Sequence, residues 1–218
     1  GMEERFGREG FPPECLAQQG EGNQARLYAA APGFPAVTLE HGGRIPMEDL
    51  EVTALHTPGH TPGHMVLYLP QEQLLFCGDH ILFDITPNIS VWNQAPNSLK
   101  DYLNSLDAID ELPIRAAFPA HRAGGREPDA AHRRIKELKA HHAKRLEEIY
   151  QAVAAAPDST AYQVAGKITW SVRGLPWEEF PPHQRWFAMG ETLSHLDYLT
   201  EEKRISRIEQ AGCAVYRV

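Results

Sequence analysis

Alternation of apolar and polar positions between residues 50 and 77 predicts three strands. Leu50–Leu55 alternates regularly, which is typical of a half-buried strand. Met65–Leu69 and Leu74–Cys77 are nearly continuous apolar runs on either side of a turn, and together they predict an antiparallel hairpin. A shorter strand is expected at 36–39, followed by a turn at 41–44.

Helical spacing replaces this alternation further along the chain. Leu99, Tyr102, Leu106 and Ile109 predict a helix over 98–111, capped by Ser98, with one face packed on a sheet. A short buried strand is expected next, and beyond it three more helices and a closing hairpin. These elements are predicted at 116–118, 129–156, 160–168, 183–199 and 203–218. By contrast, residues 1–35 carry little pattern, and Gly20 and Gly22 weaken a short helix at 16–31.

Charge and composition divide the chain in two. Residues 133–218 carry 13 Lys+Arg and 11 Asp+Glu, whereas the whole chain has a formal net charge of −8. A Gly- and Pro-containing connection at 122–128 separates the acidic part from the rest. We therefore expect domains at 1–127 and 128–218, and three helices with a closing hairpin make the second winged-helix-like.

The expected cellular location of the protein is inferred from sequence features that are missing. No apolar run is long enough to span a membrane, and the first residues are charged rather than signal-like, so no membrane partner is expected. The three cysteines are scattered and odd in number, which favours a reducing cytoplasm without disulfides. We read Cys77 as a packed thiol.

The stretch Leu55–His64 concentrates the candidate chemistry. His56, His60 and His64 are four residues apart, but the Pro and Gly residues between them exclude a helix, so we expect a loop after a strand. A histidine-rich loop presents ligands well to a metal, and the alternative is that these residues only shape the turn. His141 and His142 are adjacent on a predicted helix, and we expect both to be solvated.

Three residues share one position relative to predicted strands. His60, Asp79 and His121 each lie in a loop directly after a strand, and each side chain is a good ligand for zinc or iron. If these strands are neighbours in one sheet, the three loops open at the same edge. A carboxylate there can also bridge two ions.

These residues resemble a known family. Thr57-Pro-Gly-His60-Thr61, Phe76-Cys-Gly-Asp79 and Pro119-Ala-His121 are similar to the last three motifs of the metallo-β-lactamase fold hydrolases. The resemblance implies an α/β chain holding the second half of an αββα sandwich, followed by the winged-helix domain of the hydroxyacylglutathione hydrolase-like branch. It also implies up to two Zn ions (or Fe or Mn), with His60 on one, His121 on the other and Asp79 between them. His56, His64 and His80 would be supporting residues around these ligands.

One family feature is missing. The principal metal motif of the family is His-x-His-x-Asp-His, and this chain contains no His-x-His. It would keep three of the seven usual ligands, so metal should bind weakly. Three explanations fit: the sequence begins after the missing half, a second chain supplies that half, or the protein is a reduced, non-catalytic relative.

The leading functional hypothesis is a metal-dependent hydrolase acting on a small-molecule thioester, lactone or phosphodiester, with weak or no activity as this chain alone. The second is a non-catalytic interaction protein, in which exposed apolar surface makes a homodimer. The third is a winged-helix nucleic-acid binder. A balance of +2 over residues 133–218 is too small for strong phosphate binding, so a nucleic-acid partner is not expected.

Overall fold

The chain forms two compact units in the computed structural model, which describes residues 1–22, 33, 35–170 and 174–218. The sheet unit comprises residues 39–147, and the helical unit joins residues 1–38 to residues 148–218. The division differs from the boundary expected at 127/128, because it falls within helix α5 (Ala130–Ala155). The balance of charged residues changes near the Gly/Pro connection at 122–128. The two compact units, by contrast, are defined by packing between distant parts of the chain, which composition does not record.

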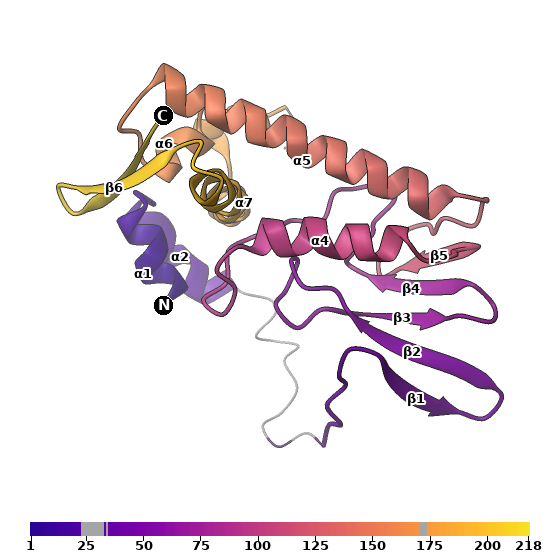
Figure 1. The fold of residues 1–218 in the computed structure, drawn as a ribbon. Helices are drawn as coiled ribbons and strands as arrows, with labels where there is room; N and C mark the ends of the chain where they lie inside the picture. The colour runs from indigo at the N-terminus through magenta and orange to yellow at the C-terminus, as the bar shows by residue number, and fades with distance from the viewer. Residues whose placement is uncertain (23–32, 34, 171–173) are drawn as a thin grey trace. The chain divides into compact units, whose positions relative to one another are not determined.

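A mixed five-stranded sheet in the order β1-β2-β3-β4-β5 forms the core of the sheet unit (Figure 1). Its strands are β1 (Gly43–Met47), β2 (Leu50–His56), β3 (Met65–Leu69), β4 (Leu74–Gly78) and β5 (Ala116–Pro119). The first four are antiparallel, and β5 runs parallel to β4. Parallel neighbours need a crossover, which contains helix α4 (Ser98–Asp110). The strands predicted at 50–55, 65–69, 74–77 and 116–118 are confirmed.

The first strand of the sheet lies further along the chain than predicted. Residues 36–39 form no strand, and β1 instead begins at Gly43, within the predicted turn. Gly43 and Pro46 both discourage a strand locally. Pairing with β2 overrides this, with Arg44 opposite Thr53, and Pro46 is tolerated because β1 is an edge strand.

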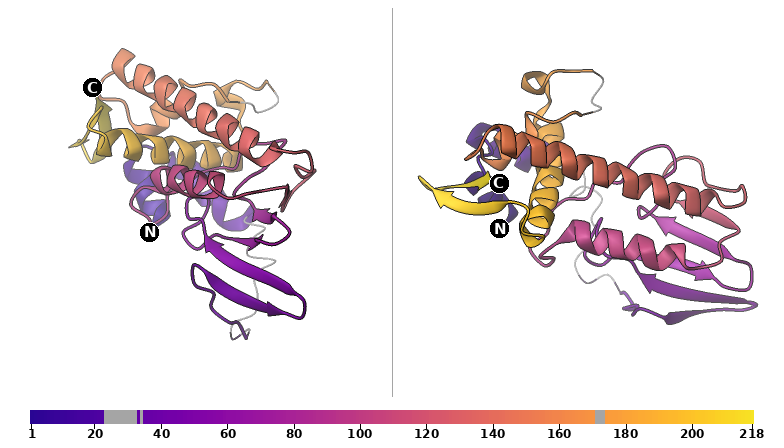
Figure 2. Two further views of the ribbon diagram at one scale, coloured as in Figure 1. Left: turned by 45° about the vertical axis from the view of Figure 1, so that its right-hand side comes forward. Right: turned by 45° about the horizontal axis from the view of Figure 1, so that its top comes forward.

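Helix α4 covers one face of the sheet (Figures 1 and 2). Its buried residues include Leu99, Tyr102, Leu106 and Ile109, as the helical spacing predicts. The N-cap is Asn97 rather than Ser98, because the Asn97 side chain accepts a hydrogen bond from the Lys100 backbone N–H at 3.0 Å.

The start of α5 belongs to the sheet unit and packs near α4. The rings of Tyr102 and His142 lie 5.4 Å apart, and His142 is fully buried. The expected solvation of His142 is therefore wrong, while His141 is half-buried. Adjacent helical residues point about 100° apart, so one member of such a pair can face the core.

Helices dominate the second unit. Its elements are α1 (Met2–Arg8), α2 (Pro13–Gly22), the end of α5, α6 (Ala161–Ala165), a 3-10 turn η1 (Trp177–Glu179), α7 (Pro182–Glu201), β6 (Ser206–Gln210) and β7 (Cys213–Arg217). The expected helices near 160–168 and 183–199 and the closing hairpin are confirmed. Helix α1 was not expected, and the helix predicted at 16–31 overlaps α2, with 23–31 outside the described residues. Phe6 of α1 packs on Trp186 of α7 at 4.1 Å between ring centroids, a contact that local pattern does not reveal.

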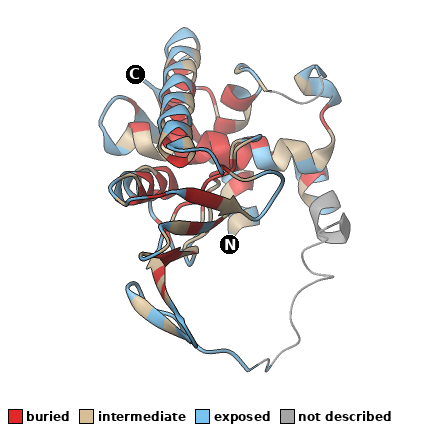
Figure 3. Ribbon diagram, turned by 90° about the vertical axis from the view of Figure 1, so that its right-hand side faces the viewer, coloured by how far each residue is buried: buried red, intermediate tan, exposed pale blue. Residues whose placement is uncertain are grey.

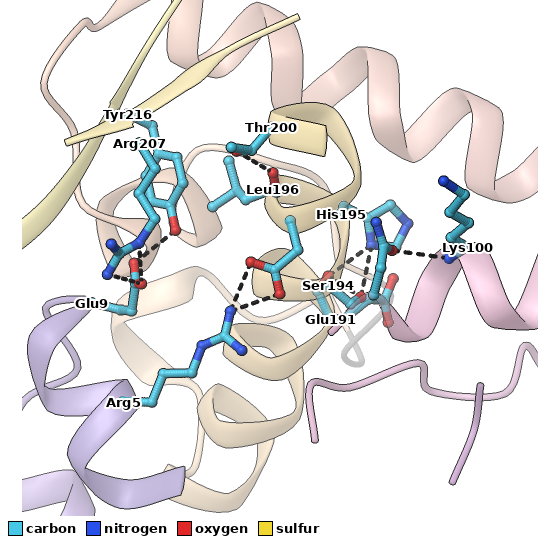
Figure 4. A network of polar contacts seen from close by, with 12 residues as sticks. Arg5, Glu9, Lys100, Glu191, Ser194, His195, Leu196, Thr200, Arg207 and Tyr216 are labelled. Atoms are coloured by element: carbon cyan, nitrogen blue, oxygen red, sulfur yellow. Dashed lines mark hydrogen bonds and ion pairs between the residues drawn. The ribbon is translucent and has the colours of Figure 1, made fainter. Parts of the chain in front are cut away.

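A buried ionic network joins α1 to the closing hairpin (Figure 4). Glu9 is fully buried, and its carboxylate accepts hydrogen bonds from Arg207 Nε at 3.0 Å and Tyr216 Oη at 2.9 Å. Arg5 pairs with Asp197 of α7 at 2.6 Å. Burial raises the pKa of Tyr216, and the Glu9 carboxylate adds to this shift, so the phenol stays protonated and remains a donor. A buried carboxylate is tolerated here because it is paired and hydrogen-bonded.

Among the described residues, no helix is both long and apolar enough to cross a bilayer.

Candidate metal centre

The loop between β2 and β3 is a series of turns, as its Pro and Gly residues predict. The Thr57 backbone N–H donates to the His64 carbonyl at 2.9 Å and closes the loop. Helix α4 holds the loop from one side, since Ser105 Oγ donates to the Pro58 carbonyl at 2.9 Å. Gly59 has φ +137°, and a Cβ there would lie 2.4 Å from Cβ of Tyr102. The loop can approach α4 this closely only because residue 59 is glycine.

His60, Asp79 and His121 come together at one edge of the sheet. The distance from His60 Nε2 to Asp79 Oδ2 is 3.8 Å, and that from His121 Nε2 to Asp79 Oδ1 is 3.1 Å. Asp79 directly follows β4, and His121 lies two residues after the end of β5; these strands are parallel, so their carboxyl ends lie at the same edge. The carboxylate therefore lies between two imidazoles, with one oxygen toward each.

The orientation of His60 is set by a segment without a clear sequence pattern. His60 Nδ1 lies 2.9 Å from the Asn88 carbonyl, so Nδ1 carries a proton that it donates there, and Nε2 is the ring nitrogen that faces Asp79. Trp92 Nε1 donates to the His60 carbonyl at 3.0 Å. Both partners belong to the irregular segment 81–97, where no periodicity or motif marked them.

His64 supports the backbone of Asp79. Its Nε2 accepts a hydrogen bond from the Asp79 backbone N–H at 3.1 Å, and its Nδ1 lies 2.9 Å from Thr57 Oγ1. Burial lowers the pKa of His64, and His60 lowers it further, which favours the neutral ring that this acceptor role requires. Gly78 has φ +54°, and a Cβ there would lie 2.7 Å from His64 Nε2. This position matches the supporting role expected for His64, which stays a prediction.

The other two histidines near the centre differ in their surroundings. His80 is fully buried, and burial lowers its pKa to about 3, so the ring is neutral. The Tyr102 hydroxyl donates to the His80 carbonyl at 2.8 Å. His56 is exposed, and its Nε2 donates to the Pro62 carbonyl at 2.8 Å, within its own loop rather than toward Asp79.

Cys77 is not a nucleophile in this setting. It is fully buried, and burial raises its pKa to about 12. The thiolate that reacts is therefore not formed near neutral pH. The reading of Cys77 as a packed thiol is confirmed.

The carboxylate of Asp79 has the character of a cation ligand. Its Oδ1 is buried and accepts no aligned hydrogen bond from the described residues, although His121 Nε2 lies within ion-pair distance. A buried carboxylate oxygen in this state is stabilised by a bound cation or by an ordered water molecule. Yet among the described residues no three His, Cys, Asp or Glu side chains converge into an ion site. The donors suit a divalent metal in kind, but two ions sharing them would each have fewer than the three protein ligands of a typical catalytic zinc.

Sequence profiles of known families match both parts of the chain. The profile described as "Metallo-beta-lactamase superfamily" matches residues 3–121, which is more than half of the chain. A second, described as "Metallo-beta-lactamase-like, C-terminal domain", matches residues 146–218.

Solved structures and curated proteins agree with these profiles. A metallo-beta-lactamase family protein from Thermus thermophilus is 29% identical with a TM-score of 0.77, over 97% of this chain and 62% of its own. A beta-lactamase domain protein from Burkholderia ambifaria is 27% identical with a TM-score of 0.82, over 98% of this chain and 60% of its own. The "Beta-lactamase-like protein 2 homolog" of Caenorhabditis elegans is 28% identical over 62% of this chain and 44% of its own length.

The chain thus spans less than two thirds of these relatives. Within that span, the fold resembles both solved structures, and the superfamily profile includes the three residues that meet at the sheet edge. The chain belongs to the metallo-beta-lactamase superfamily.

Proposed function

We propose that His60, Asp79 and His121 are metal ligands of a hydrolase of this superfamily. The observation that carries this proposal is the placement of Asp79 between two imidazole Nε2 atoms, with one buried oxygen lacking an aligned donor. His60 would hold one ion and His121 a second, with Asp79 between them. Zinc suits these donors best, and iron or manganese would also accept them.

The residues of this chain position the ligands. The Asn88 carbonyl fixes the tautomer and direction of His60, and His64 holds the backbone of Asp79. Such partners commonly orient metal-binding histidines and carboxylates. A bound ion supplies Lewis acidity toward a carbonyl or phosphoryl oxygen and lowers the pKa of bound water toward about 7.

A thioester is the substrate class that the relatives favour. Proteins named "Atrochrysone carboxyl ACP thioesterase" in Aspergillus fumigatus and Aspergillus chevalieri are 30% and 28% identical to this chain over 97 and 101 residues. The Aspergillus fumigatus protein is covered over only 21% of its length, so its substrate is not transferred. Lactones and phosphodiesters are the alternatives within the same chemistry.

Activity should be weak for residues 1–218 alone. Each ion would have one histidine and one carboxylate oxygen from this chain, and sites with so few protein ligands bind weakly. We expect hydrolysis of a small acyl thioester close to the uncatalysed rate, with or without added zinc. Fast turnover that chelation abolishes would show that the three donors suffice.

Zinc affinity tests the ligand assignment separately from activity. Competition with a chromophoric chelator should show at least tenfold weaker zinc binding for Asp79→Asn and for His60→Ala. His56→Ala is the matched control in the same loop, and its affinity should stay within twofold, because the His56 ring is directed at Pro62. Equal affinities for Asp79→Asn and the unchanged chain would contradict the assignment.

We also infer a winged-helix-like arrangement for residues 128–218, of the kind found in the hydroxyacylglutathione hydrolase-like branch. Helices α5, α6 and α7 followed by the hairpin β6–β7 support this inference, as does the C-terminal-domain profile over residues 146–218. Its role would be that of a helical domain accompanying the metal centre rather than that of a nucleic-acid reader.

A further inference from the structure

A cavity beside the start of α5 lies wholly within the sheet unit. It measures about 420 Å³, a size that suits a small molecule, and its walls come from Phe83, the loop 124–127 and the first turns of α5. The charged side chains that line it are Arg126, Arg133, Arg134, Glu127 and Glu137. Basic groups therefore outnumber acidic groups around this cavity.

Two glycines allow the loop to form one wall of the cavity. A Cβ at Gly124 would lie 2.6 Å from the Ala117 carbonyl oxygen, and a Cβ at Gly125 would lie 2.4 Å from the ring of Phe83. The Gly125 carbonyl also accepts a hydrogen bond from the Ala117 backbone N–H at 2.9 Å. Side chains at these two positions would force the loop away from β5 and from Phe83, so the shape of the wall depends on glycine.

Arg134 is a fixed part of the cavity wall. Its Nε donates to the Leu82 carbonyl at 2.7 Å, and its Nη2 donates to the Ile85 carbonyl at 3.0 Å. Its Nη1 pairs with Glu137 at 2.8 Å. These bonds occupy the guanidinium group on three sides, so Arg134 shapes the cavity and has few donors left for a ligand.

The other two arginines keep donors available for a ligand. Arg133 Nη1 donates to the Pro128 carbonyl at 2.8 Å, which fixes the guanidinium group near the start of the helix. Its ion pair with Glu127 is long, at 3.4 Å, and the Glu127 side chain is 84% exposed, so this pair contributes little. Arg126 is exposed and forms no hydrogen bond or ion pair with any residue that the structure describes.

The first turns of α5 concentrate positive charge where a helix tolerates it least. Arg133, Arg134 and Lys136 fall within the first seven residues, and the first turn contains no acidic residue. A helix N-terminus already carries partial positive charge, so cations there are unfavourable unless an anion lies close. Arg133 and Lys136 are exposed, and exposed positions follow one side of α5 (pale blue in Figure 3). A bound anion would offset this charge.

The cavity borders the candidate metal centre without being part of it. Phe83 lies four residues after Asp79, and Gly124 lies three residues after His121, so the loops that carry these candidate ligands continue into the cavity walls. Three residues of extended chain span at most about 11 Å, which limits the distance between His121 and Gly124. The loop and the start of α5 lie between the two segments that the family profiles match, 3–121 and 146–218.

We propose that this cavity binds a phosphate group, held by Arg126 and Arg133 and by the N-terminus of α5. Guanidinium groups bind phosphate oxygens through paired hydrogen bonds, and a helix N-terminus favours the same negative charge. The phosphate can be free inorganic phosphate or part of a phosphorylated organic molecule. The short connection to the loops of Asp79 and His121 favours an organic molecule that also reaches the metal centre. This last step rests on the proposed function, whereas phosphate binding itself does not.

Isothermal titration calorimetry in a chelating buffer tests the cavity independently of any metal. Two of the probes are phosphopantetheine and pantetheine, which differ only in one phosphate group, and the third is inorganic phosphate. We expect saturable binding of phosphopantetheine to residues 1–218, at least tenfold tighter than that of pantetheine. Inorganic phosphate should compete for the same site with lower affinity.

Arg126→Gln combined with Arg133→Gln should weaken phosphopantetheine binding at least tenfold. Lys136→Gln is the matched control, because Lys136 is exposed on the same turns of α5 and does not line the cavity, so its affinity should stay within twofold. Arg134 is left unchanged, since it is bonded to two backbone carbonyls. Circular dichroism checks that each variant is folded. Undiminished binding by the double variant, or an equal loss in Lys136→Gln, would overturn the proposal.

The three probes also identify the source of the phosphate. Inorganic phosphate that binds as tightly as phosphopantetheine, and is lost in the double variant, would support the phosphate site and assign it to the free ion. Equal binding of pantetheine and phosphopantetheine, or no binding of any probe at millimolar concentration, would overturn the proposal. The zinc competition experiment depends on Asp79 and this one on Arg126 and Arg133, so failure of the metal assignment and failure of the phosphate site are distinguishable.

Discussion

Gly59 and Gly78 lie at the two points where the backbone around the candidate metal centre approaches other groups most closely. Gly59 touches α4 at Tyr102, and Gly78 lies against the ring of His64. Both have positive φ, which costs any other residue conformational energy. The geometry of the three candidate ligands therefore depends on residues that carry no chemistry themselves.

Gly59→Ala should destabilise the protein by about 2–6 kcal/mol, since a positive φ and a close contact each cost about 1–3 kcal/mol. The measurement is urea unfolding followed by circular dichroism. Gly63→Ala in the same loop is the control, because a Cβ there meets nothing within 4 Å, and its change should stay within about 0.5 kcal/mol. Equal effects of the two substitutions would disprove the close approach to α4.

His80 should make the metal-free protein less stable in mild acid. Its pKa is lowered to about 3 by burial, from 6.5, so below about pH 6.5 the unfolded chain binds a proton that the folded chain does not. The contribution of His80 to the free energy of unfolding is therefore fully present above about pH 6.5. It falls by about 1.4 kcal/mol for each pH unit as the pH drops toward 3. His64, whose pKa is also lowered, acts in the same direction.

Urea unfolding in a chelating buffer at pH 7.5 and pH 5 measures this effect. We expect a loss of about 2 kcal/mol between the two values from His80 alone. His80→Phe should flatten the dependence by removing the titrating ring, whatever its effect at pH 7.5. An unchanged slope in that variant would show that His80 is not the group responsible.

Among single residues, the sequence indicated the candidate ligands better than their partners. His60, Asp79 and His121 were recognisable because each follows a predicted strand, and strand ends meet at a sheet edge. Asn88 and Trp92 were not, because they act from an irregular segment through a backbone carbonyl and a ring N–H. Neither interaction leaves a periodic or compositional signal.

At the scale of elements, periodicity predicted the helices and strands that bury one apolar side. It missed elements that form because a neighbouring part of the chain stabilises them. Helix α4 and strands β2 to β5 have strong patterns and were predicted. Strand β1 contains Gly43 and Pro46 and exists because β2 offers a partner. Helix α1 is only seven residues long, too short for a periodic signal. It is held within the helical unit by contacts such as the hydrogen bond from Tyr216 to Glu9, the residue that follows α1.

Tyr216→Phe tests the attachment of α1 to the closing hairpin. It removes a donor to the buried Glu9 carboxylate and should cost about 1–3 kcal/mol in the free energy of unfolding. Glu4→Gln is the control, because the Glu4–Arg8 pair lies on the surface of the same helix and should have no measurable effect. No loss in Tyr216→Phe would indicate that Arg207 alone satisfies Glu9.

At the scale of the whole molecule, charge argues against nucleic acid as a partner. The chain has a net charge of −8, and residues 133–218 reach only +2. Binding to phosphate backbones requires several neutralised phosphates and weakens steeply with salt. Fluorescence anisotropy with a labelled DNA duplex should therefore show no salt-dependent binding by residues 1–218 at 50 mM salt, and tight binding lost at 200 mM would contradict this.

Local periodicity and short motifs next to strand ends were enough to predict the α/β class, most of the strands, the principal helices and three candidate ligands. Other features became visible only in the folded chain: which nitrogen of His60 faces Asp79, that His142 is buried and where β1 lies. Each of these depends on contacts between residues far apart in the chain. Burial and pairing are properties of those contacts, and no local pattern records them.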